Sequence, residues 1–323
     1  MRKTAWMVIL ALFLVPALAS QALAWGSATH AYIMEQVSTA VYQLRMQEVY
    51  GAMVPDLFNY LFGVPFQGWL HDTAHATWAP PDDSGIMALW ARAEEADQKA
   101  VAAGFAGHNN LWGADSTAHH LGIPGAVYPN GYVIQKALIL DGFIYLTPGD
   151  LGDFYRSIPD ATRWEICHNI VEAAGDILVM GWDPTIGGKI QAAAMSRIPE
   201  FPSMLARAYA RGLADLTGGQ YSWAQKLIRN LEREFRMMMV GYGAALSQDQ
   251  ATAIYLLAQD MARLAEAYLG ELPSGIGQEE ITAFIQEAMI ACIYSGLLAD
   301  YQAQIDATVA FVAAQLPAHG IVY

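Results

Sequence analysis

Histidines and acidic residues concentrate in the first half of this chain, at spacings that suit metal ligation. Seven of the eight histidines lie between residues 30 and 168, and only His319 lies in the C-terminal half. Neutral imidazole and carboxylate oxygen suit zinc, and bridging carboxylates allow several ions to share ligands. The chain has only two cysteines, which excludes a zinc site built from thiolates. The pattern therefore indicates a site for divalent metal ions with nitrogen and oxygen ligands.

The clearest local pair is His168 with Glu172. We predict a helix from Asp160 through Met180, and residues four apart share one face of a helix, so both side chains can reach one ion. Many helices carry such a pair as a solvated contact, so the pair alone is consistent with either role.

A second unit is Asp115 with His119. On a helix these two side chains share a face, whereas His120 points roughly 140° away. We therefore expect His119 to be the ligand and His120 its alternative. The competing interpretation is a helix end that is merely polar.

The first residues predict export. Arg2 and Lys3 precede an almost wholly apolar run at 5–19, and Ala22-x-Ala24 is the small-residue pattern of a signal peptidase site. We therefore predict a signal peptide at residues 1–24 and a periplasmic or secreted protein.

Cleavage there would make Trp25 the mature N-terminus. Its α-amino group, with an ordinary pKa near ~8, would be a metal ligand that no internal residue can provide. His30 lies five residues further on, close enough to bind the same ion.

Three more candidates lie between these units. Asp56 follows a proline in a helix-start context, where an aspartate is usually a cap. His71 comes next as a candidate ligand. We expect His75 to be a second-shell donor or a surface residue.

The order of these pieces resembles the zinc-dependent phospholipase C family and its relatives, the single-strand-specific zinc nucleases. Those proteins begin with a tryptophan that binds zinc, followed by an Asp and a His, a helix with Asp and His, and a helix with His and Glu or Asp. The resemblance covers roughly residues 25–180. It implies two or three Zn²⁺ ions with these ligands: Trp25, His30, Asp56, His71, Asp115, His119, His168 and Glu172.

The resemblance also implies a mechanism. Asp115 would bridge two ions, and Asp56 would be the catalytic residue that orients or deprotonates the attacking water. Paired divalent cations lower the pKa of bound water and neutralise phosphate charge. We expect hydrolysis of a phospholipid phosphate ester, with transient contact to a membrane surface. The alternatives are a non-catalytic helical protein with a relic or structural metal site, and a zinc nuclease.

One position departs from the family pattern. The family has a histidine four residues before the shared Asp115, where this chain has Leu111. His108 would lie about 10 Å from Asp115 along a continuous helix, so it can substitute only if the segment Asn109-Asn110 is looped.

Composition and periodicity predict an all-α fold. Apolar residues make up 54% of the chain, helical periodicity recurs along it, and alternating β patterns are scarce. We expect a phospholipase C/nuclease-like region at 25–182 and further helices at 183–323 that pack on it or extend it. The predicted helices are 29–48, 86–103, 133–143, 160–180, 202–216, 221–245, 248–269, 278–299 and 300–315.

The net charge and the cysteines add two limits. A formal net charge of −14 argues against a general nucleic-acid binder, which relies on a basic face, so we expect no stable nucleic-acid binding. Cys167 and Cys292 are consistent with one disulfide or with two buried thiols.

Overall fold

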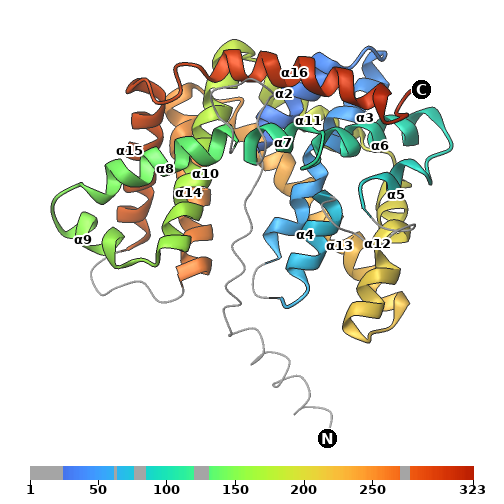
Figure 1. Ribbon diagram of the computed structural model, residues 1–323, viewed down its shortest axis with the longest axis horizontal. Helices are drawn as coiled ribbons and strands as arrows, with labels where there is room; N and C mark the ends of the chain where they lie inside the picture. Colours follow the sequence, from blue (N-terminus) through green and yellow to red (C-terminus); the bar gives the residue numbers. More distant parts are fainter. Residues whose placement is uncertain (1–24, 62–63, 76–84, 120–130, 270–276) are drawn as a thin grey trace, which may run out of the picture.

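The computed structural model describes residues 25–61, 64–75, 85–119, 131–269 and 277–323. Within these ranges every regular element is helical, which confirms the predicted all-α class (Figure 1). The predicted signal peptide and His120 lie outside the described residues. None of the described helices is both long enough and apolar enough to span a membrane.

Fifteen α-helices and one 3-10 helix follow one another along the described chain. The α-helices are α2 (Ser27–Val37), α3 (Tyr42–Met53), α4 (Gln67–His75), α5 (Met87–Trp90), α6 (Ala96–His108), α7 (Ala114–His119), α8 (Tyr132–Tyr145), α9 (Asp150–Ser157), α10 (Asp160–Trp182), α11 (Ile186–Ser196), α12 (Phe201–Thr217), α13 (Tyr221–Ala245), α14 (Gln250–Leu269), α15 (Gln278–Tyr294) and α16 (Tyr301–Ala318), and the 3-10 helix is η2 (Val54–Tyr60). The helices predicted beyond residue 183 are confirmed to within a few residues, except that the one expected at 278–299 ends earlier, at Tyr294. Both cysteines, Cys167 and Cys292, are buried free thiols.

Two predicted helices are each divided in two. The single helix expected at 29–48 is wrong, because the chain is extended between α2 and α3. Ser38 and Val41 have ψ angles of 128° and 158°, and the Ser38 hydroxyl donates to the Glu48 carboxylate. The helix expected at 86–103 is divided into α5 and α6, because the residue before α6 is extended, with a ψ of 160°. The apolar period continues across the first break, so periodicity alone does not mark it.

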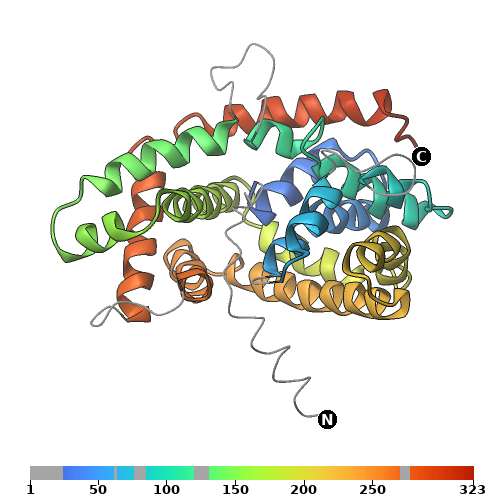
Figure 2. The same cartoon turned by 60° about the horizontal axis from the view of Figure 1, so that its bottom comes forward.

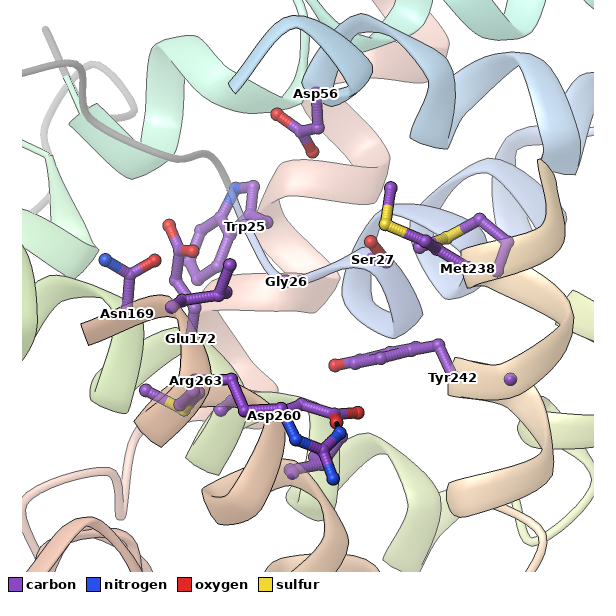
Figure 3. Close-up of a pocket in the computed structure, with 16 residues that line it drawn as sticks. Trp25, Gly26, Ser27, Asp56, Asn169, Glu172, Met238, Tyr242, Asp260 and Arg263 are labelled. Carbon is purple, nitrogen blue, oxygen red and sulfur yellow. Dashed lines mark hydrogen bonds and ion pairs between the residues drawn. The ribbon is translucent and has the colours of Figure 1, made fainter. Parts of the chain in front are cut away.

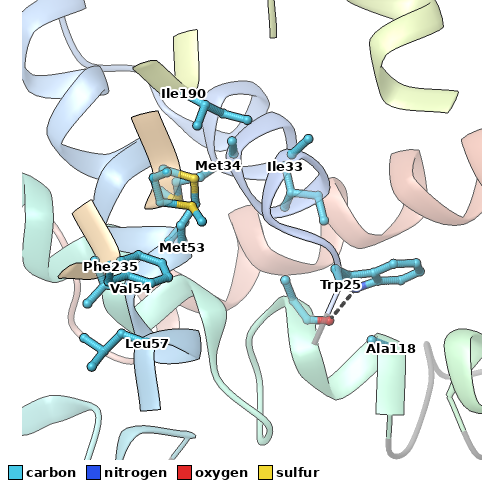
Figure 4. Close-up of a cluster of buried hydrophobic side chains, with 14 of the residues drawn as sticks. Trp25, Ile33, Met34, Met53, Val54, Leu57, Ala118, Ile190 and Phe235 are labelled. Atoms are coloured by element: carbon cyan, nitrogen blue, oxygen red, sulfur yellow. Dashed lines mark hydrogen bonds between the residues drawn. The ribbon is translucent and has the colours of Figure 1, made fainter. Parts of the chain in front are cut away.

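Helix α2 lies at the centre of the fold, against α3, α10, α11 and α16. Its residues Ile33 and Met34 belong to one buried cluster with Ile190 of α11 and Phe235 of α13 (Figure 4). Helix α16 runs across α2, α6 and α7, so both ends of the described chain pack together (Figure 2). The helices beyond residue 183 therefore help to hold the first-half helices that carry most of the histidines.

Helices α3 and α6 approach each other closely because glycines face the neighbouring backbone. A Cβ atom at Gly51 would lie 2.1 Å from the Val101 carbonyl oxygen, and one at Gly104 would lie 1.9 Å from the Glu48 carbonyl oxygen. Only glycine permits backbone contacts this short. The pair matters for the candidate site, because η2 follows α3 directly and α6 ends at His108.

We expect Gly104→Ala to lower the free energy of unfolding by about 1–3 kcal/mol, because the added methyl group forces two packed helices apart. Alanine is the better helix former by roughly 1 kcal/mol, so the helix propensity opposes this loss. Gly142→Ala in α8 is the matched control, since no atom lies within 4 Å of its added Cβ, and it is expected to stabilise. Urea unfolding measures both variants, and an equal effect of the two would contradict the close packing.

Candidate metal centre

Three groups of buried donor side chains converge between η2 and helices α2, α4, α6, α7 and α10. In each group the candidate ligand atoms lie within 4.8 Å of one another. The groups are His30 with Asp56 and His108, His75 with His108 and Asp115, and His119 with His168 and Glu172. Because His108 belongs to two groups, the first two form one continuous cluster. These buried clusters can hold metal ions.

Asp115 lies at the centre of this arrangement. Its Oδ1 atom is 3.1 Å from His30 Nε2, and its Oδ2 atom is 3.2 Å from His108 Nε2. The same Oδ2 atom is 3.7 Å from His75 Nε2 and 4.0 Å from His119 Nδ1. One carboxylate with both oxygens facing several imidazoles is an arrangement that suits a ligand shared between ions.

Hydrogen bonds fix the tautomers of two of these rings. His75 Nδ1 lies 2.8 Å from the His71 carbonyl oxygen, and His108 Nδ1 lies 2.6 Å from the Ala52 carbonyl oxygen. A carbonyl only accepts, so each Nδ1 carries the proton, and in the neutral ring each Nε2 carries a lone pair. The two Nε2 atoms are 3.1 Å apart. Two lone pairs at this distance repel unless a cation or a shared proton lies with them.

The third group also brings two imidazole nitrogens close to each other beside a carboxylate. His119 Nε2 lies 2.9 Å from His168 Nε2, and the Glu172 Oε1 atom lies 2.6 Å from His168 Nε2. The same Oε1 atom is 3.6 Å from His119 Nε2. The predicted pairing of His168 with Glu172 on one helix face is therefore present, and His119 joins it from α7.

Several donor atoms of the clusters make no hydrogen bond with the described residues. They are His30 Nε2, Asp115 Oδ1 and Glu172 Oε1, all buried, although His30 Nε2 and Asp115 Oδ1 lie 3.1 Å apart and Glu172 Oε1 lies 2.6 Å from His168 Nε2. A buried polar atom without a partner is costly, and native proteins rarely leave one unsatisfied. Donor atoms that lie this close together without hydrogen-bond geometry fit ligands gathered around cations.

Burial and mutual charge perturb the acids and bases of the clusters. Burial raises the pKa of Glu172 well above its ordinary value, and the nearby carboxylates of Asp56 and Asp115 raise it further. Burial alone would lower the pKa of His108, but the same two carboxylates raise it to about 9. The site therefore attracts positive charge.

A short turn brings His108 back toward α7. Asn109 Oδ1 accepts hydrogen bonds from the backbone N–H groups of Leu111 and Trp112, at 2.8 and 2.9 Å. The loop that His108 needs in order to reach Asp115 is therefore present. Leu111, at the position where the family has a histidine, is 51% exposed, whereas His108 is fully buried and faces the carboxylate.

Helix α4 presents His75 to the cluster. His75 is fully buried, so its interpretation as a surface residue is wrong. His71 Nδ1 lies 2.6 Å from Asn59 Oδ1, and Asn59 Nδ2 donates to Asp56 Oδ1 at 3.0 Å. His71 thus contacts the cluster through Asn59 and by stacking on the His75 ring, with centroids 4.0 Å apart, and the three groups found among the described residues are formed without it.

Trp25 lies beside the helix that carries Asp115. Its indole Nε1 donates to the Ala114 carbonyl oxygen at 2.9 Å and lies 3.2 Å from Thr117 Oγ1. The first described residue of the chain is therefore held next to α7.

Asp176 fixes the start of α2 from α10. Its carboxylate accepts hydrogen bonds from the backbone N–H groups of Ala28 and Thr29, at 2.9 and 2.8 Å. It also accepts from the hydroxyls of Thr29 and Tyr242, at 2.6 and 2.5 Å. These backbone groups belong to the first turn of α2, so Asp176 caps that helix from outside it. A Cβ at Gly26 would lie 2.5 Å from the carboxylate, so only glycine fits there.

Sequence reasoning missed Asp176 and left His75 out of the ligand set. A signal for Asp176 was available, because it continues the four-residue spacing of His168 and Glu172 on α10. His75 also follows His71 by four residues, so both lie on one helix face and spacing does not choose between them.

A cleft of about 410 Å³ opens onto this region (Figure 3). Trp25, Asp56 and Glu172 lie at one end of it, Gly26 and Ser27 line it at the start of α2, and helices α10, α13 and α14 contribute the other lining residues. Its size is that of a small-molecule site. A substrate in the cleft would therefore contact donors of two of the three groups.

No protein-family model, curated protein or solved structure matches this chain. Function is therefore inferred from the geometry of the clusters and the cleft.

We expect His75→Ala to weaken zinc binding more than His71→Ala. The first change removes a donor of the cluster. The second removes a residue that acts through Asn59, and the loss of such an orienting residue should lower metal affinity by roughly 10- to 100-fold. Zinc titration against a competing chelator measures both. A larger loss in the His71 variant would reverse the assignment.

We expect Asp176→Asn to lower the free energy of unfolding by about 3 kcal/mol, because its amide NH₂ would face hydrogen-bond donors. Tyr242→Phe removes only one of these donors and should cost about 1 kcal/mol. Urea unfolding compares the two. Equal losses would show that the cap on α2 contributes little.

Proposed function

We propose that this protein is an exported zinc-dependent phosphodiesterase of the phospholipase C type, which hydrolyses a phospholipid phosphate ester. The observation that supports it most is the position of Asp115, whose two oxygens face donors of all three groups. Phosphoesterases with two metal ions need ligands that hold the ions near one another. A shared carboxylate between imidazole-rich groups meets that need.

The residues present fit such a set of ions. Nitrogen and oxygen donors in buried positions suit zinc, and His30, Asp115 and Glu172 each carry a buried donor atom that meets no hydrogen-bond geometry. The proposed ligands are His30, Asp56, His75, His108, Asp115, His119, His168 and Glu172, with the α-amino group of a processed Trp25. Bound divalent ions would lower the pKa of water and neutralise the charge of the phosphate.

Asp56 is the proposed catalytic residue. It lines the cleft, so it would meet both substrate and water. Asn59 donates to its Oδ1 atom at 3.0 Å and is itself held by His71, which fixes the direction of the carboxylate. A carboxylate fixed in this way can orient the attacking water and accept its proton.

Charge favours a compact phosphate ester over a nucleic acid. The formal net charge of −14 opposes the approach of a polyanion. Arg263, the basic side chain among the described residues of the cleft, pairs with Asp260 at 2.7 Å. In this proposal the neutralisation of the phosphate therefore falls to the ions and not to arginine or lysine.

We expect protein that begins at Trp25 to bind two or three Zn²⁺ ions per chain and to hydrolyse phosphatidylcholine. One alanine added before Trp25 should reduce the bound zinc and the activity, because an amide replaces the α-amino ligand. Elemental analysis and an assay of the released phosphorylated head group measure the two effects.

The matched control carries the extra alanine after Tyr323 and should keep both zinc and activity. Absence of bound zinc in the processed protein would end the proposal of an enzyme. Hydrolysis of single-stranded DNA in place of phosphatidylcholine would favour the nuclease alternative.

A further inference from the structure

One wall of the cleft is apolar and comes from α13 and α14, which lie outside the region that resembles the phospholipase C family. Met238 and Met239 of α13 face Leu257, Met261 and Leu264 of α14. Met238 is 40% exposed, whereas Met239 and Leu257 are each 2% exposed, so the apolar wall continues from the surface inward.

The polar side chains along these walls are largely engaged with one another. The Tyr242 hydroxyl donates to Asp176, at 2.5 Å, and Arg263 pairs with Asp260 at 2.7 Å. A ligand along the wall therefore meets methionine and leucine side chains and few free hydrogen-bonding groups. This favours a hydrocarbon over a sugar or a peptide.

The two ends of the cleft differ in chemistry. At the inner end lie the carboxylates of Asp56 and Glu172, which belong to the candidate metal clusters. Trp25 lies there too, but its ring is fully buried, with centroids 5.7 Å from Tyr132 and 5.5 Å from Tyr301. Its face is therefore not offered to a nucleobase, which removes one means of binding a nucleotide.

We propose that the wall formed by α13 and α14 is a binding subsite for one hydrocarbon chain of the phosphate-ester substrate. This inference rests on the proposed function, since the clusters at the inner end would hold the phosphate. Methionine side chains suit the role, because they are unbranched and adapt to flexible apolar ligands. A volume of about 410 Å³ accommodates one such chain and not a second macromolecule.

The test uses a series of alkyl phosphates, from methyl to decyl, below the concentrations at which they form micelles. Their affinity for the zinc-loaded protein is measured by calorimetry, with inorganic phosphate as the chain-free reference. We expect affinity to rise about fourfold for each methylene that is buried, until the chain reaches solvent.

Neighbouring methionines provide a matched pair of variants. Met238→Gln combined with Met261→Gln should flatten the dependence on chain length and leave the affinity for inorganic phosphate unchanged. Met237→Gln should keep the full dependence, because Met237 is 61% exposed and does not line the cleft. Circular dichroism and urea unfolding establish that each variant is folded.

The outcomes separate this inference from the proposed function. Zinc binding and phosphatidylcholine hydrolysis without any dependence on chain length would overturn the subsite alone. A dependence on chain length that Met238→Gln and Met261→Gln do not alter would also overturn it. A steep dependence that those changes abolish, in a protein that hydrolyses no phosphodiester, would support the subsite and overturn the enzyme.

Discussion

Asp115 is a fully buried carboxylate, and a buried charge is costly unless its partners compensate it. Those partners come from separate parts of the chain: His30 from α2, His75 from α4 and His108 from α6. Burial alone would raise the pKa of Asp115, but His108 and His30 hold it well below its ordinary value. The fold therefore brings three helices together around one charge, and the close packing of α3 on α6 supports that convergence.

Imidazoles alone do not satisfy this cluster. The Nε2 atoms of His75 and His108 face each other with their Nδ1 protons already donated to carbonyl groups. A proton shared between them would not supply a hydrogen bond to His30 Nε2 or Glu172 Oε1, which lie 3.1 Å from Asp115 Oδ1 and 2.6 Å from His168 Nε2 without hydrogen-bond geometry. Ions with several coordination positions would satisfy all of these atoms together, and this is the physical reason to interpret the cluster as a metal centre.

Sequence periodicity located most of the long helices, but it missed α11 and did not decide the final choice of donors. Long apolar patterns located α12 to α16, and local spacing paired His168 with Glu172. The break at Ser38 was not apparent, because a hydrogen bond from its hydroxyl to Glu48 ends the helix while the apolar period continues. Similarly, His71 and His75 share one helix face, and only the tertiary position of Asp56 beside α4 determines which ring enters the cluster.

His108 illustrates a different limit. The sequence allowed it to reach Asp115 on one condition, a loop immediately after it. The side chain of Asn109 provides that loop by accepting two backbone hydrogen bonds. Asparagine commonly forms such turns. The sequence therefore allowed a loop after His108 but did not show that the loop forms.

The helices beyond residue 183 are connected to the candidate metal centre by more than shared packing. Tyr242 of α13 lines the cleft and donates to Asp176, which caps the first turn of α2. Helix α2 also carries His30, which contacts Asp115, and Trp25 lies just before this helix. A displacement of α13 would therefore disturb the start of α2 and, through it, the donor at His30. The apolar wall and the proposed zinc ligands are consequently linked by direct contacts, although they lie in different halves of the sequence.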